Sequence, residues 1–143
     1  MNPLSADALS TMSAAAASGR EAWKRGAIEE AEKHFLDAWS ALPDPKLEQD
    51  YGQSLSRGLT VFYRDTKQCE KAKQWLQTTR EAYGPGPDDS IEFLAGTVHL
   101  DCGELDEAYR LFQPLFVKFG SRPFEGSDGK YLAFYRKRTK ERH

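Results

Sequence analysis

The sequence predicts an all-α fold made of helix pairs, and two observations support this prediction. Apolar residues recur three and four positions apart along most of the chain, which is the spacing of one face of an α-helix. In addition, a segment near the start returns 77 residues later, with Gly19 matching Gly96 and Phe35 matching Phe112. A fixed shift of this kind indicates internal repeats, and repeated helix pairs stack into all-helical arrays.

The matching residues also suggest how each pair is built. Gly19 and Gly96 would let two helices approach closely, whereas Gly26 and Gly103 would turn the chain between the helices of a pair. The alanine and phenylalanine that follow each turn would form the inward face of the second helix. We therefore expect six residues to be buried between helices: Gly19, Ala31, Phe35, Gly96, Ala108 and Phe112.

Apolar stripes and helix-stop residues divide the chain into seven expected helices. They cover about 5–25, 28–42, 46–64, 69–83, 89–102, 105–119 and 127–140. The third is longer than a 34-residue repeat needs, because we assign about seven extra residues to the first helix of the middle pair. We expect Asp88 or Asp89 to cap the fifth helix and Ser127 or Asp128 to cap the last one. Pro114 should kink or break the sixth helix.

The order Gly, Gly, Ile or Leu, Ala, Phe in the two outer pairs resembles the tetratricopeptide repeat. The resemblance gives repeats at about 12–45, 53–86 and 89–122 within one domain spanning 1–143. It is weakest in the middle repeat, where Thr60 stands in place of glycine. The resemblance implies a right-handed superhelix of three antiparallel helix pairs with a C-terminal capping helix. It also implies a concave groove lined by the first helix of each pair, and no enzyme activity.

The groove pattern of this family places nine residues of the chain on the concave surface. They are Arg20, Trp23, Lys24, Arg57, Val61, Arg64, Phe93, Thr97 and Leu100. Four of the nine are cationic in a chain of formal net charge −2, which suggests a protein partner with an acidic surface. Trp23 and Phe93 would be its apolar anchors. The alternative is that these cations are only the solvated ends of surface helices.

Composition and charge limit the other classes of function. The chain has 20 basic and 22 acidic residues, so we do not expect nucleic-acid binding through overall charge. The last eight residues hold five Lys or Arg and one acid, which leaves nucleic-acid binding through this basic tail as an alternative. Cys69 and Cys102 are too few and too far apart to predict a disulfide framework. No segment approaches the ~20 apolar residues of a membrane span, and we expect a cytoplasmic protein without membrane partners.

One pair of residues has the minimum spacing for a metal site or for a catalytic pair. His99 and Cys102 lie three positions apart and could share a helix face, as a metal pair or as a thiolate with its base. No third and fourth ligand has matching spacing, and neither a phosphate-binding loop nor a nucleophile elbow occurs. We therefore expect no catalytic residue, no metal and no cofactor. A protein-protein interaction module is the expected class.

A second resemblance concerns the segment PFEGSDGKYLAFYRKR at 123–138. It is similar to the C-terminal end of small bacterial tetratricopeptide-like proteins found beside secreted toxins. That resemblance implies an immunity protein, whose partner is a secreted toxin domain that it neutralises by occlusion. The aromatic residues of the segment are equally explained as a cap on the last helix pair. An assembly or scaffolding adaptor would have the same features, so the sequence leaves both roles open.

Overall fold

The computed structural model describes residues 6–48 and 50–142, and no strand occurs in these two ranges. The α-helices are α1 (Ala6–Lys24), α2 (Ile28–Ala41), α3 (Asp50–Asp65), α4 (Cys69–Tyr83), α5 (Asp89–Asp101), α6 (Leu105–Phe119) and α7 (Lys130–Arg142). Two short 3-10 turns, η1 (Lys46–Glu48) and η2 (Arg122–Phe124), lie before α3 and before α7. The predicted all-α fold is confirmed. The expected start of the first helix at residue 5 lies outside the described residues.

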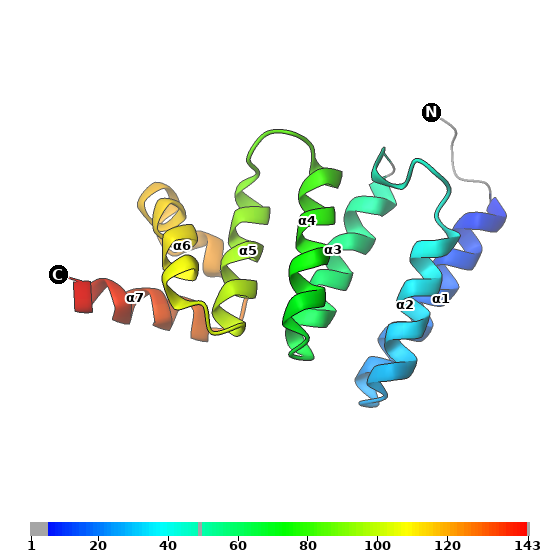
Figure 1. The fold of residues 1–143 in the computed structure, drawn as a ribbon, viewed down its shortest axis with the longest axis horizontal. Coiled ribbons are helices and arrows are strands. Elements are labelled where there is room, and N and C mark those ends of the chain that lie inside the picture. The colour runs from blue at the N-terminus through cyan, green and yellow to red at the C-terminus, as the bar shows by residue number, and fades with distance from the viewer. Residues whose placement is uncertain (1–5, 49, 143) are drawn as a thin grey trace.

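The six helices from α1 to α6 pack as pairs, each formed by two helices that follow one another in the chain. Figure 1 shows the pairs α1/α2, α3/α4 and α5/α6 side by side in a row, with α7 at the far end. Gly26 and Gly103 turn the chain in the outer pairs with φ of 79° and 80°, a conformation that glycine adopts without strain. In the middle pair Lys67 takes the corresponding role with φ of 61°.

The expected glycine contacts within the outer pairs are present. A Cβ atom added at Gly19 would lie 2.7 Å from Cδ1 of Phe35, and one added at Gly96 would lie 2.6 Å from Cδ1 of Phe112. Both distances are too short for real atoms, so each ring packs on a surface that only glycine provides. Of the six residues expected to be buried, five are buried and Phe35 is half-buried.

The middle pair uses a different contact. Thr60 stands where the outer pairs have glycine, and its hydroxyl lies 3.2 Å from the hydroxyl of Thr79 on α4. Each of the two also donates to a backbone carbonyl of its own helix, Thr60 to Ser56 and Thr79 to Trp75. Both threonines are fully buried, and these bonds satisfy their polar groups.

One expectation about an individual helix is wrong, and of the kink or break expected at Pro114 the break is absent. The extra residues of the middle repeat do not lengthen its first helix, because 46–48 form the separate turn η1 and α3 begins at Asp50. This turn folds back onto α3 at Gly52, where an added Cβ would clash with the carbonyl oxygen of Lys46. Pro114 does not break α6, which continues from Leu105 to Phe119. Buried residues on both sides of Pro114, Phe112 and Leu115, hold the helix in place, and this packing offsets the lost backbone hydrogen bond.

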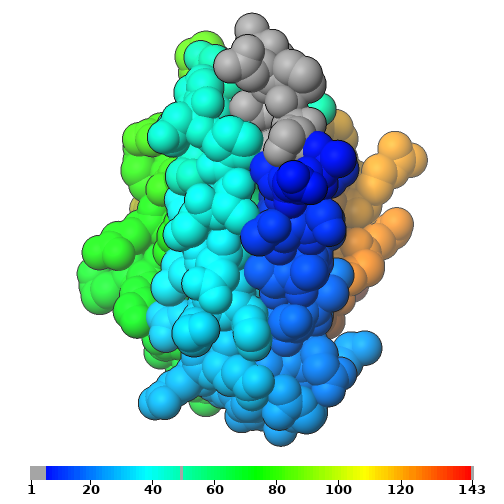
Figure 2. Space-filling model, turned by 90° about the vertical axis from the view of Figure 1, so that its right-hand side faces the viewer, coloured from blue at the N-terminus to red at the C-terminus, as the bar shows by residue number. Residues whose placement is uncertain are grey.

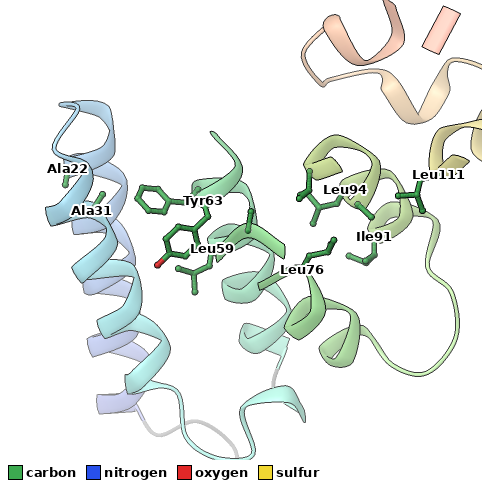
Figure 3. Close-up of a cluster of buried hydrophobic side chains, with 12 residues drawn as sticks. Ala22, Ala31, Leu59, Tyr63, Leu76, Ile91, Leu94 and Leu111 are labelled. Atoms are coloured by element: carbon green, nitrogen blue, oxygen red, sulfur yellow. The ribbon is translucent and has the colours of Figure 1, made fainter. Parts of the chain in front are cut away.

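The main hydrophobic core runs along the row and joins the pairs. Figure 3 shows Ala22, Ala31, Leu59 and Tyr63 where the first pair meets the second. The core continues through Leu76, Ile91, Leu94 and Leu111, so α4, α5 and α6 are part of the same cluster. Aromatic contacts reinforce it, with the Phe62 ring 5.1 Å from Trp23 and 5.2 Å from Phe35 between centroids.

The end of the row is covered by η2 and α7, as expected of a capping helix. Phe124, Tyr131 and Tyr135 are buried against α5 and α6, and the Tyr135 ring stacks on Tyr109 with centroids 5.3 Å apart. Asp128 accepts a hydrogen bond from the backbone N–H of Lys130, the first residue of α7. At the start of α5, the Asp88 side chain accepts from the N–H groups of Ser90 and Ile91. Both predicted caps are therefore present.

The two cysteines pair with each other, contrary to the expectation from the sequence. Cys69 and Cys102 form a disulfide with their Cα atoms 5.7 Å apart. Cys69 is the first residue of α4, and Cys102 directly follows α5. Sequence spacing of 33 residues gave no sign of this contact, because only the packing of the third pair against the second brings the two positions together.

Candidate functional site

A groove opens between α1 and α3, and it has a volume of about 570 Å³. The α1 residues Met12, Ala16 and Trp23 form one wall, and α3 supplies the other. The full lining is Met12, Ser13, Ala16, Arg20, Trp23, Phe35, Tyr51, Ser54, Leu55, Arg57, Gly58, Leu59, Val61 and Tyr83. Most of these side chains are apolar, as is usual for a surface that receives an apolar group of a ligand.

Trp23 is held in place from inside the molecule. Its ring meets Phe35 at 6.1 Å and Phe62 at 5.1 Å between centroids, both edge to face. The side chain is nevertheless only half-buried, and its remaining surface lines the groove. A large aromatic surface that is already fixed loses little conformational entropy when a partner covers it.

Arg20 and Arg57 contribute positive charge to the groove. Within residues 6–48 and 50–142, neither guanidinium lies within 4.0 Å of a carboxylate. Five other arginines of the described chain do form such ion pairs: Arg25, Arg64, Arg80, Arg110 and Arg138. Arg20 and Arg57 therefore lack a close ion pair within the described chain, although the pKa of Asp88 is lowered mainly by its hydrogen bond from Ser90 and to a smaller extent by the nearby charge of Arg57.

Gly58 leaves space in the groove. A Cβ added at this position would meet nothing within 4 Å, in contrast to Gly19, Gly52 and Gly96. Gly58 lies inside α3 without a positive φ, so neither a turn nor a close contact requires glycine there. Glycine in a helix interior costs about 1 kcal/mol relative to alanine, and the structure offers no gain in packing that offsets this cost. The effect of the missing side chain is a deeper groove.

The structure brings four of the nine residues expected on the concave surface together: Arg20, Trp23, Arg57 and Val61 line the groove, and Leu100 does not. Lys24 is exposed at the end of α1 and does not line it. Phe93 and Thr97 were expected on the same open surface, and this expectation is wrong. Phe93 packs among Phe112, Phe124 and Tyr131 under the cap, and Thr97 is only 1% exposed.

Arg64 belongs to a second, polar pocket of about 520 Å³. Its guanidinium donates to the Thr97 hydroxyl (2.9 Å) and to the Asp65 carboxylate (2.8 Å), and lies 3.8 Å from the Asp101 carboxylate. Burial disfavours the charged guanidinium, but the hydrogen bond with Asp65 and the nearby acids outweigh it, and the pKa of Arg64 is raised. The Arg64 side chain therefore makes its contacts within the protein.

The polar pocket connects α3 and α5 with the cap. Tyr131 on α7 donates its hydroxyl hydrogen to Asp101 at 3.0 Å, and the Lys130 ammonium lies 3.1 Å from the same carboxylate. Burial is the main reason that the pKa of Tyr131 is raised. Figure 2 shows the orange segment before α7 on the same side of the molecule as α1. Sequence periodicity could not identify this network, because its members come from helices far apart in the chain.

His99 and Cys102 do not form a chemical site. Cys102 is bonded to Cys69, and His99 Nδ1 lies 2.9 Å from Glu104 Oε1, while the other oxygen of this carboxylate, Oε2, pairs with Lys73. In the described part of the chain, no three His, Cys, Asp or Glu side chains are arranged to hold a metal ion.

Groove residues that the sequence-based reasoning missed are Met12, Tyr51, Leu55 and Tyr83. Met12 and Leu55 belong to the apolar stripes of α1 and α3, but a stripe does not show which of its members a neighbouring helix leaves uncovered. Tyr51 is 41% exposed, more than most large apolar side chains of the chain. Which residues line the groove depends on how α1 and α3 are placed relative to each other, and this placement is a tertiary property.

Two of the five cations in the basic tail are engaged within the protein. Arg138 forms an ion pair with Asp106, and the Arg142 guanidinium lies 4.8 Å from the centre of the Tyr109 ring. The tail is therefore part of α7 and packs on α6, which reduces the positive charge available to a nucleic acid.

Among the described helices, none combines the length and the apolar character that a bilayer crossing requires. The sequence matches no protein-family model, and comparisons with curated proteins and with solved structures found no match.

Proposed function

We propose that this chain is a non-enzymatic protein-binding module that holds its partner in the groove between α1 and α3. The observation that supports the proposal best is the combination of an apolar floor with two arginines that have no intramolecular ion pair. An apolar floor favours an apolar anchor on the partner, and Arg20 and Arg57 favour acidic side chains beside that anchor. The partner segment would therefore contain an aliphatic or aromatic residue flanked by Asp or Glu.

The rigidity of the groove is consistent with this function. Trp23 is fixed by Phe35 and Phe62, and α1 and α3 each pack along their length on the second helix of their own pair. A partner would thus bind a surface that is already formed, and the free energy of binding would not be reduced by ordering of the groove. Binding of this kind needs no catalytic group.

We make two more specific proposals, one on the arrangement of the helix pairs and one on the role of the protein in the cell. We propose that the three helix pairs form a right-handed superhelix of the tetratricopeptide type, with the groove on its concave side, in a cytoplasmic protein of bacterial origin. We further propose that the partner is a secreted toxin domain that this protein occludes. The support is the resemblance of 123–138, although its buried aromatics Phe124, Tyr131 and Tyr135 are needed as a cap in any case.

The groove proposal is tested by filling the space at Gly58. Gly58→Leu replaces glycine with a better helix former, so it should not lower stability, while its side chain occupies the groove. The matched control is Gln74→Leu, which adds the same side chain at an exposed position of α4 outside the groove. Both variants and the wild-type protein would be used for affinity capture from native cells, with quantitative mass spectrometry of the bound proteins.

The expected result is a protein that the wild type and Gln74→Leu capture equally and that Gly58→Leu loses. Titration calorimetry with that purified protein should then show affinity reduced by more than about tenfold for Gly58→Leu. Equal capture by all three would contradict a groove site. The immunity role has its own test: co-expression should protect cells from a toxin encoded by the neighbouring gene. Failure to protect, together with capture of assembly complexes, would favour the adaptor role.

A further inference from the structure

The disulfide lies at the junction of two helix pairs. Cys69 begins α4, directly after the turn of the middle pair, and Cys102 directly follows α5, at the turn of the third pair. The bond therefore fixes one turn against the other, at the end of the helices where the chain reverses direction. An ion pair between Lys73 and Glu104 (2.7 Å) crosses the same junction.

The same two turns supply the polar network that receives the cap. Arg64 and Asp65 come from the end of α3, shortly before Cys69, whereas Asp101 directly precedes Cys102. Arg64 reaches α5 through Thr97 (2.9 Å), and Asp101 accepts from Tyr131 of α7 (3.0 Å). A bond that holds Cys69 to Cys102 also holds the α3 half of this network next to the α5 half.

We propose that Cys69 and Cys102 are a redox-responsive latch that controls how firmly α7 is docked. In a reducing compartment the two residues are thiols, since disulfides there are transient. When a soluble disulfide accumulates, the crosslink forms, the two turns are fixed, and the network around Asp101 tightens on Tyr131. This inference is independent of the groove and of its partner.

The chemistry is a thiol–disulfide exchange in two steps. The Cys69 thiol loses its proton, and its sulfur attacks the soluble disulfide, which gives a mixed disulfide and releases one soluble thiolate. The Cys102 thiol then loses its proton and attacks the Cys69 sulfur, which forms the intramolecular bond and releases the second soluble thiolate. The protein is oxidised by two electrons and the soluble disulfide is reduced to two thiols. Cys69 suits the first step, because it is half-buried and the N-terminal end of α4 stabilises a thiolate.

The test compares the full chain after treatment with oxidised glutathione and after treatment with dithiothreitol. Mass spectrometry should show one intramolecular disulfide in the oxidised monomer and two thiols in the reduced one. Amide hydrogen exchange in α7 should be at least about fivefold faster in the reduced protein, while α1 and α2 exchange equally in both states.

Two variants separate a latch from a simple crosslink. Cys69→Ser with Cys102→Ser should show the faster α7 exchange under both conditions. Tyr131→Phe removes the hydrogen bond to Asp101 but keeps the disulfide, and it should exchange fast in α7 even when oxidised. The proposal is overturned if wild-type α7 exchanges equally in the two states. It is also overturned if oxidised glutathione links the cysteines between molecules, or leaves both as thiols or mixed disulfides.

Discussion

Gly96 on α5 lies directly beneath the ring of Phe112 on α6, so closely that a Cβ atom at position 96 would be 2.6 Å from Cδ1 of the ring. Phe112 is completely buried and has neighbours on its other side, including Phe93 and Phe124 at centroid distances of 5.5 and 5.1 Å. The ring therefore cannot move away from an added methyl group without disturbing the cap.

Gly96→Ala should lower the free energy of unfolding by about 1–3 kcal/mol, because an overpacked core forces its side chains and backbone to shift. Gly58→Ala is the control, since the same methyl group meets open space there and should be neutral or stabilising by up to about 1 kcal/mol. Chemical denaturation measures both. Equal effects of the two changes would show that helix propensity, and not the contact with Phe112, determines the outcome.

Phe112→Ala should cost about 3–5 kcal/mol, because it empties the space between α5, α6 and the cap. Urea denaturation followed by circular dichroism gives the value. A loss below about 1 kcal/mol would be far under the usual cost of removing a buried aromatic side chain, and would contradict the proposed equivalence of the two outer repeats.

Charge reversal of Arg20 and Arg57 together, as Arg20→Glu with Arg57→Glu, should leave the circular dichroism spectrum unchanged. It should weaken the groove partner by more than about tenfold, because glutamates would then face the acids of the partner. Lys24→Glu is the matched control, since Lys24 is exposed nearby but does not line the groove. If Lys24→Glu weakens binding as much as the double change, long-range attraction rather than contact in the groove explains the effect.

Arg64→Glu should behave differently from Arg57→Glu, although both residues were predicted to bind a partner. The Arg64 side chain is only 15% exposed and interacts with Thr97, Asp65 and Asp101. A glutamate there would face two acids, and we expect a loss of about 2–4 kcal/mol in unfolding free energy. Arg57→Glu should stay within about 0.5 kcal/mol of the wild type. Thermal and chemical denaturation of the two variants distinguish these outcomes.

Glu32 gives the protein a defined pH dependence. Its carboxylate accepts hydrogen bonds from Lys71 (2.9 Å) and Tyr63 (2.7 Å), and these two bonds, that from Lys71 first, lower its pKa. Because the pKa is lower in the folded state, the stabilisation by Glu32 is present above its unfolded pKa of about 4.3 and is lost as the pH falls through the folded value. The stability difference between wild type and Glu32→Gln should therefore shrink between about pH 5 and pH 3. A difference that stays constant over this interval would exclude the ionised carboxylate as its cause.

Local sequence signals predicted the helices and the contacts within the outer pairs. Gly26 and Gly103 turn the chain as expected, and Asp88 caps α5, because each of these features depends on residues within a few positions. The 77-residue match also located Gly19 and Gly96 correctly, since a ring packed on glycine leaves a pattern in the sequence. Pro114 was expected to kink or break α6, and the helix is not broken because tertiary packing on both sides of the proline outweighs the local preference.

The candidate site was only partly predictable. Trp23 and Arg57 could be placed from the repeat register, but the register could not show that the cap covers Phe93 or that Thr97 and Asp65 bind Arg64. The disulfide was missed for the same reason. Contacts between helix pairs depend on how far each pair is shifted relative to the next, and that shift has no local sequence signal.

The hydroxyl contact between Thr60 and Thr79 lies in the middle pair, between the two pairs that use a ring on glycine (Figure 1). In a helical array, each helix pair contacts only the neighbouring pairs, so the stability of the array is a sum of terms for the pairs and for their interfaces. In a row of three pairs, the two outer pairs can unfold in one step only if the central pair couples them. A polar contact that is already fully satisfied within each helix can be lost without leaving a buried hydroxyl unpaired. Loosening this pair by mutation should therefore weaken the cooperativity of unfolding between the two ends of the row, which the shared hydrophobic core otherwise couples.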